Sequence, residues 1–146
     1  MTDLEYALNT FYLLMTGALV MWMAAGFTML EAGLVRRRNT AEIVTKNIGL
    51  YSIASFMFLI AGFKVMYPGE DFEGQIMPGY DFSFGATLAS EKDSVDGDYS
   101  NGSDFFFQMV FVATAVSIVS GAVAERMNQW PFFALAAFIA FFVYPV

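Results

Sequence analysis

Four long apolar stretches decide what this chain can fold into. They cover residues 6–30, 47–63, 105–124 and 127–146, and none contains a charged side chain. A helix needs about 20 mostly apolar residues to cross roughly 30 Å of hydrocarbon. Three of the stretches have that length. The second reaches it if the span is taken as residues 43–66, with Lys46 and Lys64 extending their ammonium groups toward the two interfaces.

The pattern predicts an all-α transmembrane fold with four membrane-spanning helices and one long acidic extracytoplasmic loop. Hydrophobic residues make up 58% of the chain, above the roughly 45–50% apolar content of soluble domains. The outer loop is expected at residues 67–103, with a short strand or turn around residues 80–84. The predicted helices cover about residues 10–34, 43–66, 104–124 and 130–146.

The placement of charge predicts the orientation. The net charge is −7, and nine acids lie between residues 67 and 104 against one base, Lys92. The three arginines at positions 36–38 lie in the short turn after the first helix, and Arg126 lies in the turn after the third. Basic residues in short loops mark the cytoplasmic side. We therefore expect a multi-pass protein of the cell membrane (inner or plasma membrane) with its N-terminus outside, and no nucleic-acid partner.

The chain contains no cysteine and no histidine. Disulfides, zinc sites, thiol nucleophiles and imidazole bases are therefore excluded within it. No paired acid and base is evident, so we expect neither an enzyme nor a cofactor. The acidic run at residues 93–98 does not form an EF-hand, because Phe107 stands at the twelfth position counted from Asp96, and no metal site is predicted.

Local signals predict how the helices begin. Asn39 is expected to cap the second helix, with Glu42 in its first turn, where a helix N-terminus favours negative charge. Asp104 is expected to cap the third helix. Pro131 falls in the first turn of the fourth, a position that tolerates proline.

Small residues recur every four positions along the third helix. Ala113, Ser117 and Gly121 form a stripe that favours close helix packing in lipid. The hydroxyl groups of Ser117 and Ser120 are expected to bond back to carbonyl oxygens one turn earlier rather than line a pathway.

Two phenylalanines at the outer end of the same helix are candidate binding residues. Phe107 and Phe111 are one turn apart and share a face. Aromatic faces replace part of a cation's hydration shell, each contributing about 0.5–2 kcal/mol. Lipid-facing or core positions are the alternative. Gln108, beside them, must find a polar partner or water at that depth.

Glu31 is the one acid near the inner end of the first helix. It is either a functional ionisable group or a structural one, paired with the arginines at positions 36–38 or capping neighbouring backbone.

Two segments resemble the N-terminal portion of the ammonium transporter family. They are AGFTMLEAGLVRRRNTAEIVTKN, residues 25–47, and FFFQMVFVATAVSIVSGAVAERM, residues 105–127. The resemblance covers the whole chain, residues 1–146. It implies a partial ammonium transporter domain that contains about four of the family's eleven helices. The bare apolar ending after Tyr144 also leads us to expect the N-terminal part of a longer protein.

The resemblance implies a function and a set of site residues. Ammonium or ammonia would be the substrate, the full-length protein would be a homotrimer, and a cytoplasmic PII-type regulator would be a partner. Phe111 would fall on the first phenylalanine of the gating pair and Phe107 on the outer vestibule ring. The family's two pore histidines would lie beyond Val146.

Two other functions remain open. One is an ammonium sensor domain, in which a transporter-like unit is joined to a signalling module. The other is a small self-contained helical membrane protein that assembles through the stripe of Ala113, Ser117 and Gly121.

Overall fold

The computed structural model describes residues 3–67 and 98–145, and these residues contain helices and turns but no strand. The predicted strand at residues 80–84, most of the acidic loop and the predicted placement of the Lys64 ammonium group lie outside this description. The helical elements are α1 (Asp3–Leu34), the 3₁₀ turn η1 (Arg37–Asn39), α2 (Thr40–Met57), the π-helical turn η2 (Phe58–Gly62), α3 (Phe63–Met66), α5 (Asn101–Ala122), α6 (Gln129–Phe138) and the π-helical turn η4 (Ile139–Val143).

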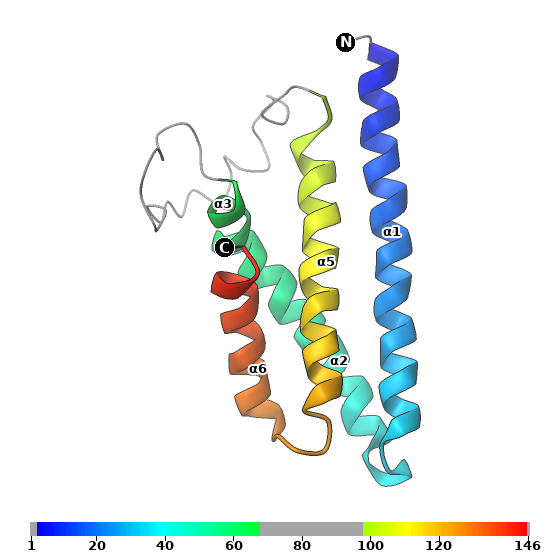
Figure 1. Ribbon diagram of the computed structural model, residues 1–146, viewed down its shortest axis with the longest axis vertical. Coiled ribbons are helices and arrows are strands. Elements are labelled where there is room, and N and C mark those ends of the chain that lie inside the picture. Colours follow the sequence, from blue (N-terminus) through cyan, green and yellow to red (C-terminus); the bar gives the residue numbers. More distant parts are fainter. Residues whose placement is uncertain (1–2, 68–97, 146) are drawn as a thin grey trace.

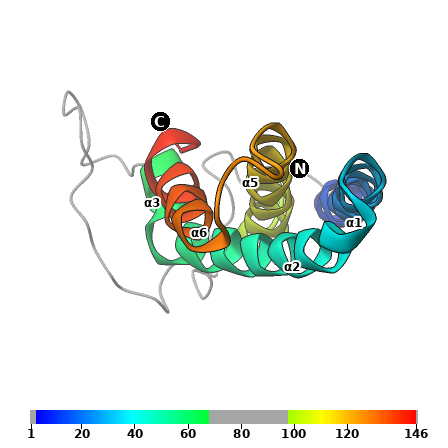
Figure 2. The ribbon, with the colours of Figure 1, turned by 90° about the horizontal axis from the view of Figure 1, so that it is seen from below.

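Helix α2 forms one side of the bundle, and three helices pack on it. Figure 1 shows α1 and α5 side by side over most of their length, with α6 beyond α5 and α2 crossing behind them. In Figure 2, seen from below, α2 runs along one edge while α6, α5 and α1 lie on the same side of it. The most extensive packing joins α1 to α5 and α2 to α5. Helix α5, which carries most of the predicted site residues, is therefore held on two sides.

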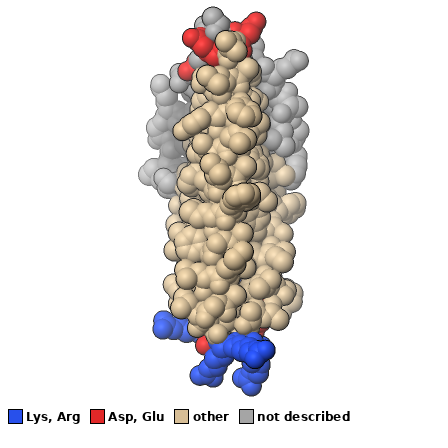
Figure 3. All heavy atoms as spheres, turned by 90° about the vertical axis from the view of Figure 1, so that its right-hand side faces the viewer, with Lys and Arg blue, Asp and Glu red and all other residues tan. Residues whose placement is uncertain are grey.

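The charged side chains lie at the two ends of this bundle. Figure 3, which looks onto α1, shows basic residues gathered at one end with a few acidic atoms beside them, acidic residues at the other end, and an uncharged surface between the two ends. The end that carries Arg36, Arg37 and Arg38 is called the arginine end below, and the end that carries Asp3 is called the N-terminal end. The α1 surface between them exposes large apolar side chains such as Trp22, which is 79% exposed. Such a surface is stable in lipid and not in water.

Three helical segments are long and apolar enough to cross a membrane: Asp3–Leu34, Arg37–Ile60 and Asn101–Ala122. The fourth predicted span is a shorter apolar helix, Gln129–Val143. The chain is thus a multi-pass membrane protein with an all-helical fold.

The helix starts differ from some of the predictions. Helix α5 begins at Asn101, after Ser100, so Asp104 lies in the first turn and the prediction that it caps the helix is wrong. Asn39 does precede α2, but its side chain makes no cap hydrogen bond and binds another turn instead. Pro131 lies in the first turn of α6, as predicted.

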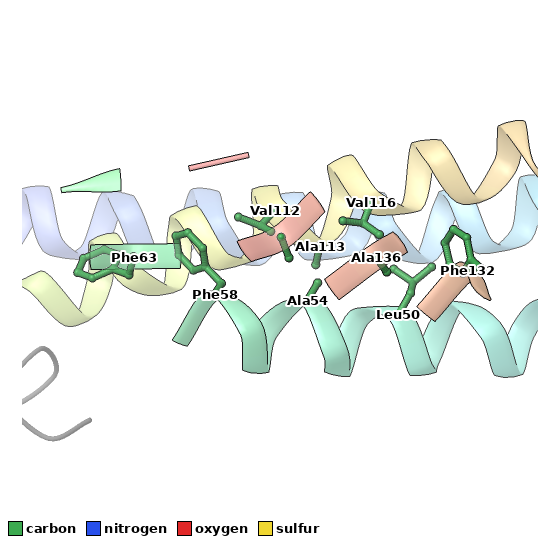
Figure 4. Close-up of a cluster of buried hydrophobic side chains, with 10 residues drawn as sticks. Leu50, Ala54, Phe58, Phe63, Val112, Ala113, Val116, Phe132 and Ala136 are labelled. Atoms are coloured by element: carbon green, nitrogen blue, oxygen red, sulfur yellow. The ribbon is translucent and has the colours of Figure 1, made fainter. Parts of the chain in front are cut away.

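A buried apolar cluster joins α2, α5 and α6 (Figure 4). Small side chains alternate with large ones in this cluster, so the helices can approach closely and gain dispersion contacts. These contacts matter in a membrane, because lipid tails are as apolar as the helices and the hydrophobic effect does not drive the helices together. Gly49 is one position of close approach, because a Cβ there would lie 2.8 Å from Cζ of Phe133 in α6. The cluster consists of Leu50, Ala54, Phe58, Phe63, Val112, Ala113, Val116, Phe132, Ala136 and Ala140.

Candidate functional site

The first turns of α5 direct successive phenylalanines to different neighbours. Phe105 packs toward the core, where its ring stacks on Phe58 with 5.8 Å between the centroids. Phe106 packs against α1 at Gly17, where a Cβ would lie only 2.8 Å from Cε1 of the Phe106 ring. A helix turns about 100° per residue, so Phe107 is left on a third side.

Phe107 and Phe111 contact each other on that third side. Their ring centroids are 4.8 Å apart and their planes are inclined by 60°. Both side chains are half-buried, and among the described residues neither belongs to the apolar core cluster. The pair therefore forms an aromatic surface separate from the core, in the N-terminal half of α5.

A polar cluster lies beside this pair. Nε2 of Gln108 donates a hydrogen bond to Oη of Tyr67 at 3.1 Å. The Tyr67 hydroxyl is also hydrogen-bonded to the carboxylate of Asp104, which is buried in the first turn of α5. Burial, with the adjacent negative charge of Asp104, raises the pKa of Tyr67 to about 12. The partner that Gln108 requires at this depth is thus a tyrosine at the end of the α2–α3 segment.

Sequence reasoning missed Tyr67, to which Gln108 donates, and Asp104, which is hydrogen-bonded to both of these side chains. Asp104 and Gln108 are four residues apart and so share a helix face, a spacing that is visible in the sequence. Tyr67 could not be assigned to that face, because its position depends on how α3 packs against α5.

Two hydrogen bonds hold the start of α5 against α1. Nδ2 of Asn9 donates to the carbonyl oxygen of Asp98 at 3.2 Å, and the backbone N–H of Ser100 donates to Oγ1 of Thr10 at 3.2 Å. These contacts place the start of α5, and with it Phe107, at the N-terminal end of the bundle.

The predicted stripe on α5 faces its neighbouring helices in three different settings. Ala113 is fully buried in the apolar cluster. Ser117 is buried and lines a cavity of about 280 Å³ together with residues of α1 and α2. A Cβ at Gly121 would lie 3.4 Å from Oε1 of Glu31 in α1.

Glu31 is the centre of a buried polar network near the arginine end. Its Oε2 atom lies 3.7 Å from Nζ of Lys46 and accepts a hydrogen bond of 3.2 Å from Nδ2 of Asn47. Oγ of Ser120 lies 3.1 Å from both this oxygen and Oδ1 of Asn47, and its single proton bonds to one of them at a time. All four residues are buried.

This network corrects three predictions. Glu31 pairs with Lys46 and not with the arginines at positions 36–38. Lys46 does not extend to an interface, because it is only 5% exposed and its ammonium group bonds inside the bundle. Ser120 does not bond back along its own helix but reaches α1 and α2. One physical cause explains all three differences from the predictions. A charged group or a hydroxyl group that is buried among helices is stable only when it has a hydrogen-bond or ion-pair partner.

The turn after α5 is bonded to the turn after α1. Glu125, an exposed residue, accepts hydrogen bonds at Oε1 from the backbone N–H of Arg36 at 3.0 Å and from Nδ2 of Asn39 at 2.9 Å. These donors, with the nearby positive charges of Arg36 and Arg38, lower the pKa of Glu125. Glu125 also has a positive φ of 59°, which is unfavourable for a residue with a side chain. The same residue thus has a strained backbone conformation and a side chain that makes two hydrogen bonds.

Within residues 3–67 and 98–145, no group of three or more acidic side chains is arranged to hold a metal ion. The chemistry that this part of the chain offers is therefore that of aromatic rings, a few buried hydrogen-bonding groups and one buried ion pair.

Comparison with known proteins identifies the family. The model of the Ammonium Transporter Family matches residues 11–146. Ammonium transporter Amt2 of Archaeoglobus fulgidus is 37% identical over 97% of this chain, and this match spans 28% of that relative. Ammonium transporter Amt2 of Methanocaldococcus jannaschii is 33% identical, and the match covers 100% of this chain and 33% of the relative. Ammonium transporter Amt1 of Haloferax mediterranei is also 33% identical, and that match covers 94% of this chain and 25% of the relative.

The chain thus spans about a quarter to a third of the length of these relatives, which carry the names of transporters and not of enzymes. No solved structure gives a significant match. The family model covers nearly the whole chain in agreement with the membrane-spanning fold, and the chain belongs to the ammonium transporter family.

Proposed function

We propose that residues 1–146 form part of an ammonium transporter, in which the N-terminal half of α5 contributes to the outer cation site. The observation that supports this most strongly is the Phe107–Phe111 pair, with its ring centroids 4.8 Å apart and outside the apolar core. Gln108, bonded to Tyr67, extends the same region with polar groups.

The physical argument concerns the cost of moving a charge through lipid. An ion at the centre of a bilayer is very unfavourable, whereas neutral ammonia is not. Aromatic faces bind a cation by about 0.5–2 kcal/mol each while excluding water. A pair of rings at an entrance therefore binds the ammonium ion first. The ion then loses its proton, and neutral ammonia and the proton cross the membrane separately. Potassium cannot lose a proton and is rejected on the same path.

The proposed orientation is supported by the distribution of charge between the two ends of the bundle. The arginine end carries Arg36, Arg37 and Arg38 and the opposite end carries acids (Figure 3). By the preference of basic loops for the cytoplasm, the arginine end faces the cytoplasm of a cell membrane and the N-terminus lies outside. Phe107 then lies near the outer surface.

The family resemblance extends the proposal to partners. The whole protein would assemble as a homotrimer, and a PII-type regulator would bind on the cytoplasmic side. The apolar surface of α1 is suited to contact with lipid or with other helices.

The test is uptake of labelled methylammonium by cells that express the whole protein. We expect F111A to reduce uptake or its discrimination against potassium at least tenfold. F138A is the matched control, because Phe138 belongs neither to the Phe107–Phe111 pair nor to the apolar core cluster of the described residues. If F111A and F138A behave alike, the gate assignment is wrong. Ammonium binding with no uptake by the wild-type protein would indicate a sensor instead.

A further inference from the structure

The ammonium group of Lys46 lies where α1, α2, α5 and α6 meet. Lys46 belongs to α2, and its Nζ donates to the backbone carbonyl oxygen of Ser120 in α5 at 3.3 Å. The same atom lies 3.7 Å from Oε2 of Glu31 in α1. On a third side it lies over the ring of Phe132 in α6, 5.1 Å from the centroid. One cation thus contacts all three helices that surround it.

These three groups are the kinds that recognise an ammonium ion. A lysine ammonium has three N–H donors and no acceptor. A carbonyl oxygen accepts a hydrogen bond, a carboxylate supplies the opposite charge, and an aromatic face attracts the cation through its quadrupole. Glu31, Ser120 and Phe132 are all at least 97% buried, so water does not compete for these contacts.

The site also offers an acceptor that the lysine does not use. Oε1 of Glu31 is buried and has no hydrogen-bond partner among the described residues. The Lys46 head group is fixed in place by its own side chain, whereas a free ammonium ion can shift and turn any of its four N–H donors toward this oxygen. The unpaired Oε1 atom is therefore a further acceptor that a free ammonium ion could use.

A cleft connects this region to the arginine end. It has a volume of about 230 Å³ and is lined by Lys46 together with Glu42, Glu125 and Arg126, among others. A water molecule takes up about 30 Å³ in the liquid, so ions of that size can enter. Removing the Lys46 side chain would open the cleft toward the carboxylate of Glu31.

We propose that Glu31, Ser120 and Phe132 form a binding site for ammonium and methylammonium, in which Lys46 is a tethered occupant. The tether gives the lysine an effective concentration in the millimolar range or above. The wild-type site is therefore closed to free ammonium at lower concentrations. The inference stands on the contacts of Lys46 and does not depend on the transport proposal.

The test is the thermal stability of the whole protein and of its K46A variant in detergent, with ammonium chloride compared against potassium chloride at equal ionic strength. We expect 100 mM ammonium to raise the Tm of K46A by about 2–4 °C more than that of the wild type. The effect should be absent in E31Q/K46A, which lacks the carboxylate. It should also be absent in K46M, where an uncharged side chain of similar length fills the site. Binding at any other ammonium site adds about the same free energy of unfolding to all four proteins, so the comparison of K46A with the three others removes most of its effect.

An ammonium response of K46A that equals that of the wild type, or that persists in E31Q/K46A, would overturn the proposal. If K46A cannot be purified in potassium chloride, its recovery with ammonium present throughout supports the site. Failure to recover it in either salt counts against the site.

Discussion

Glu31 and Lys46 form an ion pair inside the bundle, with 3.7 Å between Oε2 and Nζ and side-chain exposures of only 3% and 6%. The pair joins α1 to α2, and the hydrogen bonds of Ser120 to Glu31 and of Lys46 to the Ser120 carbonyl join both to α5. Few other charged groups lie between the two ends of the bundle in the described part of the chain. This ion pair and its hydrogen bonds therefore fix how far α1, α2 and α5 are shifted along one another.

A double-mutant cycle on this pair should show strong coupling. We expect E31Q and K46M each to reduce the free energy of unfolding by about 3–5 kcal/mol, because each leaves its partner as a buried, uncompensated charge. The double variant E31Q/K46M should lose much less than the sum, since it leaves no charge behind. Chemical or thermal unfolding in detergent measures all four proteins. Additive losses would show that the two residues do not stabilise one another.

The contact of Gly17 with Phe106 gives a second prediction, with a control on the same helix. A Cβ at Gly17 would lie 2.8 Å from the Phe106 ring, whereas a Cβ at Gly26 would have no neighbour within 4 Å. We expect G17A to cost about 1–3 kcal/mol by overpacking. G26A should be neutral or stabilising by up to about 1 kcal/mol, because alanine favours helix.

This pair of variants also has a functional outcome. Phe106 precedes Phe107, so displacing its ring should reduce methylammonium uptake in G17A and leave it unchanged in G26A. Equal unfolding free energies for the two variants would contradict the close approach of α1 and α5.

The hydrogen bonds of Glu125 predict a pH dependence. Its folded-state pKa is lowered below 4.5 by the N–H donors of Arg36 and Asn39. The stabilisation from this group is therefore fully present above about pH 4.5 and is lost as the pH falls through the lower, folded-state pKa. E125Q should lose that part of the acid dependence, which melting curves between pH 3 and pH 6 would reveal. An unchanged acid profile in E125Q would show that the carboxylate is not held in this way.

Replacing Glu125 by glycine distinguishes the cost of its backbone conformation from the contribution of its side-chain hydrogen bonds. E125G relieves the cost of the positive φ of 59° but removes both hydrogen bonds. If the bonds outweigh the strain, E125G is less stable than the wild type at pH 7. If E125G is more stable, the side chain contributes less than its backbone conformation costs.

The spacing of apolar residues and charges accounts for most of the fold. Each predicted span overlaps one helical segment, although α1 begins at Asp3 and not near residue 10. An uncharged run of that length has few alternatives to a helix in lipid. The arginines gather at one end of the bundle, as their placement in short turns predicts, and most of the acidic loop expected at the other end lies outside the described residues. The starts of helices are less well predicted. Asp104 resembles a cap, yet its carboxylate bonds to Tyr67 instead.

The site could be predicted only where its residues are close in sequence. Phe107 and Phe111 share a face by helix geometry alone, and their rings do meet. The network of Glu31, Lys46 and Ser120 joins three helices, and its partners depend on how those helices pack. One signal was available, since Glu31 lies five residues before the arginine turn and Lys46 eight residues after it, so each lies near the end of its helix that adjoins this turn.

Cysteine accessibility at position 107 tests the central claim most directly, in a whole protein whose only cysteine is the one introduced by F107C; residues 1–146 contain no cysteine that would have to be replaced. If the Phe107 side chain lines an outer ammonium site, a membrane-impermeant thiol reagent added outside intact cells should modify F107C, and ammonium should slow the modification several-fold while potassium does not. Modification only from the cytoplasmic side, or at a rate that ammonium leaves unchanged, would contradict the account.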